Sequence, residues 1–261
     1  MCCASEYGLL HGPIFRQFGQ LNKPLSTSVS STAGKVDETP QSMFCVVFSC
    51  ASIARLRFHN PGVNMADWPQ PISLKGDYVS VVPLSHAHHD DLVEATADGE
   101  LHKLWYTMIP DGDGMAAEID RRLSLSNMLP FAIIDNASGK AVGMTTYMNI
   151  EQAHKRLEIG STWYRKSVQR TPLNTECKLL LLQHAFEDLD CICVEFRTHF
   201  ANVQSRRAIE RLGAKFDGVL RSHMIMANGS VRDTAAYSII ASEWSTVKAN
   251  LTWKLENFRS D

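Results

Sequence analysis

The sequence predicts a mixed α/β (α+β) domain in which helices flank a β-sheet. β-rich runs and amphipathic helical runs alternate along residues 77–242 in the order β-α-α-β-β-β-α-β-α-β-β. Asn228-Gly229 stands between two β-rich runs, which is a strong hairpin signal. Hydrophobic residues make up 44% and charged residues 21% of the 261-residue chain, so a core of ordinary size can form.

The first half of this regular region is predicted to contain four strands and two helices. The run YVSVVP is rich in β-formers, and Ser85 can cap the helix that follows it. In chain order, we expect a strand at 78–83, helices at 87–97 and 115–125, and strands at 131–135, 141–148 and 156–164.

The second half is predicted to contain two helices and three strands. The run KLLLLQHAF indicates a well-buried helix, and Gly213 is the usual left-handed residue that ends a helix. We expect helices at 176–189 and 202–212, and strands at 191–198, 215–226 and 231–242.

Residues 1–64 differ from the rest of the chain. Residues 25–32 are nearly all Ser and Thr, and periodicity is poor, so we expect a poorly structured extension before a domain at 65–261. The first 36 residues contain one acidic residue, Glu6, as an organellar transit segment would. We favour an untargeted extension, or a start at Met65, and a cytoplasmic protein.

The bulk properties argue against several classes of protein. A net charge of -2 lacks the basic face of a nucleic-acid-binding protein. No apolar run approaches the ~20 residues that span a bilayer, and the longest candidate, 43–53, is interrupted by serines. We therefore expect no nucleic-acid partner and no membrane partner.

Neither the cysteines nor the histidines form a recognisable metal motif. The seven cysteines contain no C-x-x-C pair, which indicates a reducing compartment without a disulfide framework, and Cys191 and Cys193 are expected to be small core residues. The three histidines in the run His86–His89 precede two aspartates at a helix start and have no second ligand group at metal spacing. We expect a solvated helix start there, and no metal.

The segment 158–178 can bind an anion. A strand is followed by a polar loop and by a helix that we expect to begin near Asn174 or Thr175. A helix start presents unpaired N–H groups and a positive dipole end, which suit a phosphate or pyrophosphate. Nearby bases are Arg165, Lys166 and Arg170. A capped helix after a solvated loop is the alternative interpretation.

Four motifs in order resemble one family. They are E-I-G-x-x-x-Y at 158–164, the loop 169–174, N-x-x-S-x-x-A-I-E-R-L-G-A at 202–214 and the final hairpin 229–240. Together they resemble the GNAT acetyltransferases, and specifically the RimJ/RimL-like branch, over about residues 68–251. The first 64 residues fall outside the resemblance.

The resemblance implies a mixed, splayed sheet that opens between the strand ending near Tyr164 and the strand 191–198, with acetyl-CoA in the opening. It implies that the pantetheine arm pairs with backbone groups of Thr162, Trp163 and Tyr164 and contacts Asn202. The pyrophosphate would lie on a set of loop residues: Gln169, Arg170, Thr171, Leu173, Asn174 and Thr175. The loop departs from the family pattern at Pro172, which has no N–H to donate, and at the larger Asn174.

Acyl transfer to an amine needs a base for the amine proton and donors for the oxygen that becomes negative. The resemblance and this chemistry together point to Glu158 as the base, and to a backbone N–H near Trp163 as the donor. Ser205 is the candidate to protonate or hydrogen-bond the CoA sulfur. Several members of the family that the chain resembles use a tyrosine further along this helix, and no tyrosine occurs within 202–213. A salt-bridged strand carboxylate is the alternative for Glu158, and helix capping is the alternative for Asn202.

We therefore expect an N-acetyltransferase that moves an acetyl group from acetyl-CoA to a primary amine, of a protein N-terminus or a small molecule, as a monomer or homodimer. The alternatives are a non-catalytic acyl-CoA-binding module, and an enzyme that uses another acyl-CoA such as succinyl-CoA. Trp105 and Tyr106 can wall the acceptor pocket or simply pack. Asp233 and Arg221 can line the acceptor side or form a cross-strand ion pair.

Overall fold

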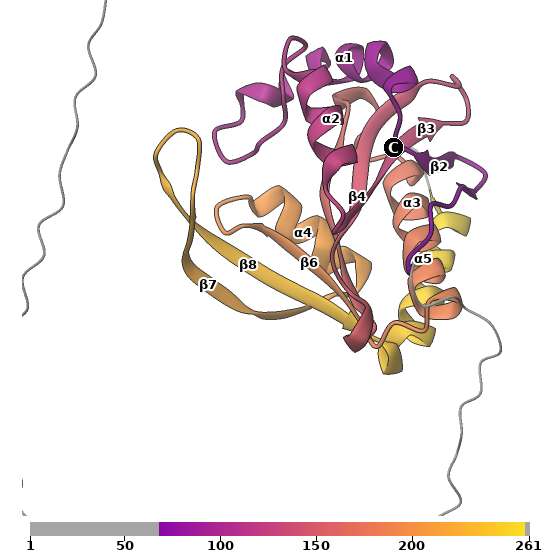
Figure 1. Cartoon of the computed structure of the whole chain (residues 1–261). Coiled ribbons are helices and arrows are strands. Elements are labelled where there is room, and N and C mark those ends of the chain that lie inside the picture. The colour runs from indigo at the N-terminus through magenta and orange to yellow at the C-terminus, as the bar shows by residue number, and fades with distance from the viewer. Residues whose placement is uncertain (1–67, 259–261) are drawn as a thin grey trace, which may run out of the picture. The chain divides into compact units, whose positions relative to one another are not determined.

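The computed structural model describes residues 68–258 (Figure 1). The predicted extension at 1–64, the alternative start at Met65 and the domain boundary between them lie outside the described residues. They stay predictions.

Within the described residues the strands form one mixed sheet in the order β1-β2-β3-β4-β5-β6-β8-β7. All neighbours are antiparallel except β5 and β6, which are parallel. The strands are β1 (Leu74–Lys75), β2 (Val79–Pro83), β3 (Met128–Asp135), β4 (Ala141–Glu151), β5 (Arg156–Tyr164), β6 (Cys193–His199), β7 (Lys215–Ile225) and β8 (Val231–Ile240). The predicted α/β fold class is confirmed.

The helices are α1 (His89–Ala97), α2 (Met115–Ser124), α3 (Pro172–Gln183), α4 (Val203–Leu212) and α5 (Trp244–Glu256). A π-helical turn, His184–Asp188, continues α3. Gly213 ends α4 in the left-handed conformation, and Gly229 turns the β7–β8 hairpin with a φ of 80°, as predicted. The sequence interpretation missed β1 and α5. It also placed Cys193 in the core, where the structure has Cys191 buried and Cys193 half-buried at the start of β6.

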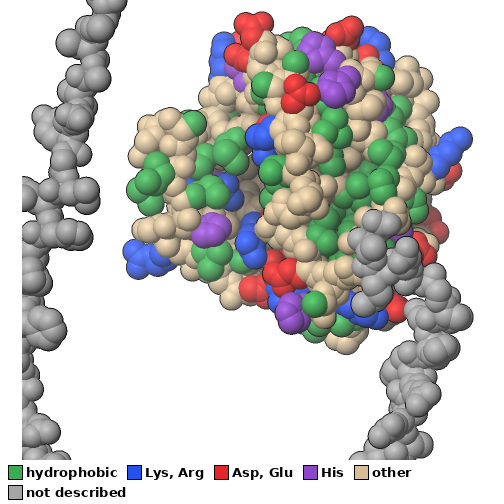
Figure 2. Space-filling model, viewed as in Figure 1, with side chains coloured by type: hydrophobic (Ala, Val, Ile, Leu, Met, Phe, Trp, Pro, Cys, Tyr) green, Lys and Arg blue, Asp and Glu red, His purple; other side chains and the backbone are tan. Residues whose placement is uncertain are grey.

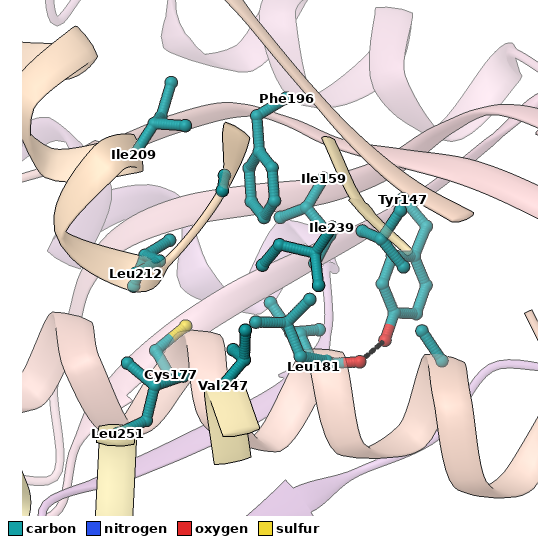
Figure 3. Packing of buried hydrophobic residues seen from close by; sticks show 14 of the residues in the cluster. Tyr147, Ile159, Cys177, Leu181, Phe196, Ile209, Leu212, Ile239, Val247 and Leu251 are labelled. Carbon is teal, nitrogen blue, oxygen red and sulfur yellow. Dashed lines mark hydrogen bonds between the residues drawn. The ribbon is translucent and has the colours of Figure 1, made fainter. Parts of the chain in front are cut away.

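Helices cover both faces of the sheet. Figure 1 shows α3 and α5 together on one side of β4 and α2 on the other. The larger core lies under α3, α4 and α5, where Leu181, Leu212 and Leu251 pack against strand residues (Figure 3). Tyr147 Oη from β4 donates a hydrogen bond to the carbonyl of Leu181 at 2.6 Å, which ties α3 to the sheet. A second core lies under α1 and α2 and includes Trp163.

The sheet opens between its two parallel strands. β5 and β6 share only three register pairs, the last of which is Glu158↔Glu195. β5 then continues to Tyr164 and β6 to His199 without pairing to each other, so the two halves of the sheet diverge upward in Figure 1. The predicted splay is present, and Glu158 lies where it begins.

Candidate functional site

Glu158 is a buried carboxyl group at the start of the splay. Glu158 is 4% exposed. Asn149 Nδ2, on β4, donates to Glu158 Oε2 at 2.8 Å, and Arg197 Nε, on β6, lies 3.5 Å from the same oxygen. A Cβ at Gly160 would lie 2.8 Å from Glu158 Oε1, so any larger residue at this position would clash with the carboxyl group.

Burial raises the pKa of Glu158, because a charged carboxylate loses its hydration there. The hydrogen bond from Asn149 and the charges of Arg197 and Arg232 lower the pKa by less. A carboxylate with a raised pKa is a stronger base than an exposed one, and the arrangement therefore suits proton abstraction. The contact with Arg197 also fits the alternative, a salt-bridged strand carboxylate.

A bulge in β5 follows Glu158. Ser161 has a φ of 49°, and the β4–β5 register shifts at this point. The guanidinium of Arg122, from α2, is 4% exposed and donates through both Nη atoms to the carbonyl of Ser161 at 3.2 Å. Arg122 thus holds the bulge from the α2 side, a role that the sequence interpretation did not foresee.

Beyond the bulge, backbone donors face the open side of β5. The N–H of Arg165 donates to the carbonyl of Val142 on β4 at 2.8 Å. Because N–H groups alternate along a strand, those of Tyr164 and Thr162 point away from β4, into the splay. By the same alternation the N–H of Trp163 points toward β4, so the backbone donors near Trp163 that face the splay are those of Thr162 and Tyr164.

The predicted phosphate loop leads into α3 earlier than expected. Thr171 is the N-cap and its Oγ1 accepts from the N–H of Leu173 at 3.4 Å, while Pro172 is the first helical residue. Proline suits this position, because the N–H that it lacks has no partner within a helix there. The expected start at Asn174 or Thr175 is wrong, and Asn174 is the third residue of α3 rather than its cap. In the first turn the N–H of Asn174 has no intrahelical acceptor, and the N–H of Leu173 meets only the Thr171 hydroxyl, so these two donors can turn to an anion.

The bases near this helix start differ from those expected. Arg165 forms ion pairs with Asp98 at 2.9 Å and Glu94 at 3.1 Å, so acidic partners already neutralise its charge. Arg170 is exposed. Arg211, from α4, donates through Nη2 to Thr175 Oγ1 at 2.7 Å, which brings a guanidinium to the start of α3. The sequence interpretation missed Arg211.

The start of α4 lies beside the same loop. Gln204 Nε2 donates to Gln169 Oε1 at 3.2 Å, and Gln169 Nε2 donates to the carbonyl of Tyr164 at 3.0 Å. Asn202 caps α4, since its Oδ1 accepts from the N–H of Ser205 at 3.0 Å. Ser205 is half-buried in the first turn of α4. The contacts bring together the loop, the end of β5 and the start of α4, as the resemblance implied.

Two of the residues expected at the acceptor side, Trp105 and Tyr106, lie beside His199 at the end of β6. Trp105 and Tyr106 stand edge-on to the His199 ring, with centroid distances of 5.2 and 6.4 Å. Asp233 accepts the backbone N–H of Ser222 at 2.7 Å, and within the described residues it forms no ion pair with Arg221. The cross-strand ion pair is therefore not present.

Other parts of the described chain lie away from this site. The predicted helix start holds His86, whose Nε2 is 2.7 Å from Asp120 Oδ1, and His88, whose Nδ1 accepts from the N–H of Ser85. Residues 68–258 contain no group of three or more His, Cys, Asp or Glu side chains placed to hold a metal ion. A cavity of about 400 Å³ between Trp68 and Met128 includes none of the predicted site residues. None of the described helices is both long enough and apolar enough to span a bilayer.

Known proteins share this architecture. The family model of the acetyltransferase (GNAT) domain matches residues 79–215, which include every predicted catalytic and cofactor-binding residue. The crystal structure of a GCN5-related N-acetyltransferase from Brucella melitensis is 35% identical, covers 74% of this chain and 90% of that chain, and has a TM-score of 0.67. A structure from T. thermophilus, provisionally described as an acetyltransferase, is 32% identical, covers 72% of this chain and 99% of that one, and has a TM-score of 0.65.

A curated relative matches a shorter part of the chain. A protein of Bacillus subtilis (strain 168), provisionally named the ribosomal N-acetyltransferase YdaF, is 30% identical over 110 residues. These residues are 42% of this chain and 59% of that protein, so the match spans less than two thirds of the relative's length. The matches of the domain model and of the solved structures, with the splayed sheet that the chain forms, show that it belongs to the GNAT acetyltransferase family.

Proposed function

We propose that the chain transfers an acetyl group from acetyl-CoA to a primary amine by direct attack, with Glu158 as the general base. The observation that carries this proposal is the position of Glu158, a buried carboxyl group at the start of the splay. Its raised pKa lets it accept a proton from an incoming ammonium group more readily than an exposed carboxylate does.

The residues around the splay fit acetyl-CoA. The outward N–H of Tyr164 can pair with an amide carbonyl of the pantetheine arm, as an added strand would, and the N–H of Thr162 is left for the thioester oxygen. The free N–H groups at the start of α3 and the guanidinium of Arg211 suit the pyrophosphate. The lost donor at Pro172 is a small cost, because the first turn of α3 still offers the N–H groups of Leu173 and Asn174.

Side-chain and backbone groups of the chain each have a role in the acetyl transfer. Glu158 takes a proton from the amine, directly or through a water molecule, which frees the lone pair for attack. The backbone N–H of Thr162 donates to the thioester oxygen as that oxygen becomes negative. Ser205 donates its hydroxyl proton or a hydrogen bond to the departing sulfur. Asn149 and Arg197 orient the Glu158 carboxyl group through the contacts to Oε2.

The test is an assay of acetyl transfer from acetyl-CoA to a panel of amines, in which the release of free CoA thiol is measured. Glu158→Gln should lower kcat by about 10²–10⁴-fold, the range typical of a lost general base, and should leave acetyl-CoA affinity unchanged. The acid limb of the pH–rate profile should disappear with it, because that limb reports protonation of Glu158. The matched control is Glu151→Gln, which changes an exposed glutamate at the end of β4. Full activity of Glu158→Gln across pH would contradict the assignment, and acetyl-CoA binding without any transfer would indicate a non-catalytic module.

A further inference from the structure

Polar side chains gather on the face of the sheet that carries Glu158. β5 pairs with β6 at Glu158↔Glu195, and β6 pairs with β8 at His199↔Thr234. Since side chains alternate along a strand, the register places on this face Glu158, Glu195, Arg197, His199, Thr234 and Arg232. Figure 2 shows basic and histidine side chains between the β7–β8 hairpin, at the left of the view, and the body of the molecule.

The charges on this face do not balance. Arg156 pairs with Glu195, and Arg197 contacts both Glu195, at 2.8 Å, and Glu158, at 3.5 Å. Two carboxylates are therefore shared between two arginines. Arg232 is left as the surplus positive charge of the set.

Arg232 keeps most of its donors free. Its Nε donates to Thr234 Oγ1 at 2.9 Å, and no described residue accepts from Nη1 or Nη2. The side chain is half-buried, and the Glu158 carboxyl group is close enough to act on it electrostatically. A guanidinium that is partly withdrawn from water and lacks a carboxylate partner is available for an anion.

His199 is a buried neighbour of Arg232. It is 7% exposed, and its Nδ1 accepts from the N–H of Ala201 at 3.0 Å. In the neutral ring the proton is therefore on Nε2, which has no hydrogen-bond partner among the described residues and is covered by the Trp105 and Tyr106 rings. Burial and the charge of Arg232 lower the pKa of His199, while the charge of Asp233 raises it by less. The Nη1 and Nη2 donors of Arg232 are therefore the donors that this part of the site presents to a ligand.

We propose that the acceptor is an amine that also carries a carboxylate, and that Arg232 binds this carboxylate while the amine lies at Glu158. The inference rests on the proposed function and names the substrate class of the same site. A planar guanidinium binds a carboxylate through two parallel hydrogen bonds, which fixes the distance and direction of the amine as well. Free amino acids and peptides that begin with Asp or Glu share this chemistry.

The experiment compares matched amines that differ in one carboxylate. One pair is a free amino acid and its amide, and the other is a peptide amide that begins with Asp and the same peptide beginning with Asn. The full chain should favour the carboxylate member of one pair by tenfold or more in kcat/KM. Arg232→Gln should remove this preference by raising KM for that member alone, and Arg232→Lys should keep part of it. Arg207→Gln, an exposed arginine on α4, is the matched control and should keep the preference.

Each outcome is decisive. Preference within the amino-acid pair identifies free amino acids as the source of the carboxylate, and preference within the peptide pair identifies an acidic N-terminus. Equal rates within both pairs, or a preference that survives Arg232→Gln, overturn the inference and leave the proposed function standing. No transfer to any of the four amines contradicts the proposed function, and the inference with it. Calorimetric titration of Arg232→Gln with acetyl-CoA should match the unchanged chain, which excludes misfolding as the cause.

Discussion

Lys178 is a charged side chain beneath the splay. It lies on α3, is 5% exposed, and donates through Nζ to Thr162 Oγ1 at 2.8 Å and to Thr145 Oγ1 at 3.1 Å. These two hydroxyls also bond each other at 2.8 Å. Burial lowers the pKa of Lys178 to about 8, because the ammonium group loses its hydration and gains no carboxylate partner among the described residues.

A lowered lysine pKa costs stability while the group is charged. Below pH 8 both folded and unfolded chains hold the proton, and the folded state bears the full cost, about 3 kcal/mol for a shift of this size. Between pH 8 and about 10.5 the unfolded chain binds more protons than the folded one, so the contribution of this group becomes less unfavourable as pH rises. Above that range the cost is gone.

Replacing Lys178 with methionine should therefore stabilise the fold near pH 7. We expect Lys178→Met to raise the free energy of unfolding by about 2 kcal/mol at pH 7, since the two threonines still satisfy each other, and the gain should shrink toward pH 10. Urea denaturation at both pH values measures it. Lys75→Met, at an exposed position on β1, is the control and should change little. A Lys178→Met chain less stable at both pH values would show that the two hydrogen bonds outweigh the desolvation cost.

At this scale the sequence identifies some site residues and hides others. Glu158 and Asn202 stand within motifs; in the structure Glu158 lies at the start of the splay and Asn202 caps α4, which was its alternative role. Glu195 and Arg197 alternate with the apolar Val194 and Phe196, so a period-two pattern alone marks one polar strand face, which His199 continues. Nothing local reveals that Asn149 bonds Glu158 or that Arg122 holds the bulge, because an arginine on a helix has the same pattern whether it faces water or a distant carbonyl.

Among the elements, α3 connects the core to the proposed cofactor site. Its start was predicted a few residues late, because proline was read as an interruption of the loop rather than as the first helical residue. Thr171 before Pro172 is an N-cap signal that identifies the true start. The core face of α3 was predictable, since the run of leucines in it is long and apolar. α5 was missed although its buried residues, Trp244, Val247 and Leu251, have the i, i+3, i+7 spacing of a helix.

The contact between α4 and α3 carries a prediction about acetyl-CoA. Arg211→Gln removes the guanidinium that contacts Thr175. The substitution should lower the affinity for acetyl-CoA about tenfold, because one charge-assisted contact is lost. The difference should narrow as salt rises, because salt screens an exposed charge. Calorimetric titration measures both effects.

Acetyl-pantetheine supplies the control for that prediction, because it lacks the pyrophosphate. Its affinity should be the same for Arg211→Gln and for the unchanged chain. An equal loss of affinity for both ligands would mean that Arg211 supports the fold of the site. Unchanged affinity for both would show that Arg211 does not bind the pyrophosphate.

For the molecule as a whole, the opening in the sheet is the feature that joins fold and function. The order of strands and helices follows from the sequence pattern, and so does the β7–β8 hairpin. The pairing of β5 with β6 does not, because parallel neighbours far apart in the chain leave no local signal. Only the family resemblance implied that these two strands are neighbours and that they separate.

A ligand in the opening would join the two halves of the sheet. The outward amides of Thr162 and Tyr164 would gain partners, and so would the free N–H groups at the start of α3. Amides already paired within β3 and β4 would keep the partners that they have. Binding therefore has a local signature that depends on where acetyl-CoA lies and not on which amine is acetylated.

Hydrogen–deuterium exchange with and without saturating acetyl-CoA measures this signature most directly. Peptides covering residues 160–165 and 172–176 should exchange more slowly when acetyl-CoA is bound, while peptides from β3 should be unchanged. Protection at both segments would establish the splay as the acetyl-CoA site. Unchanged exchange at both, under conditions where calorimetry shows binding, would place the ligand elsewhere and contradict the account of this site.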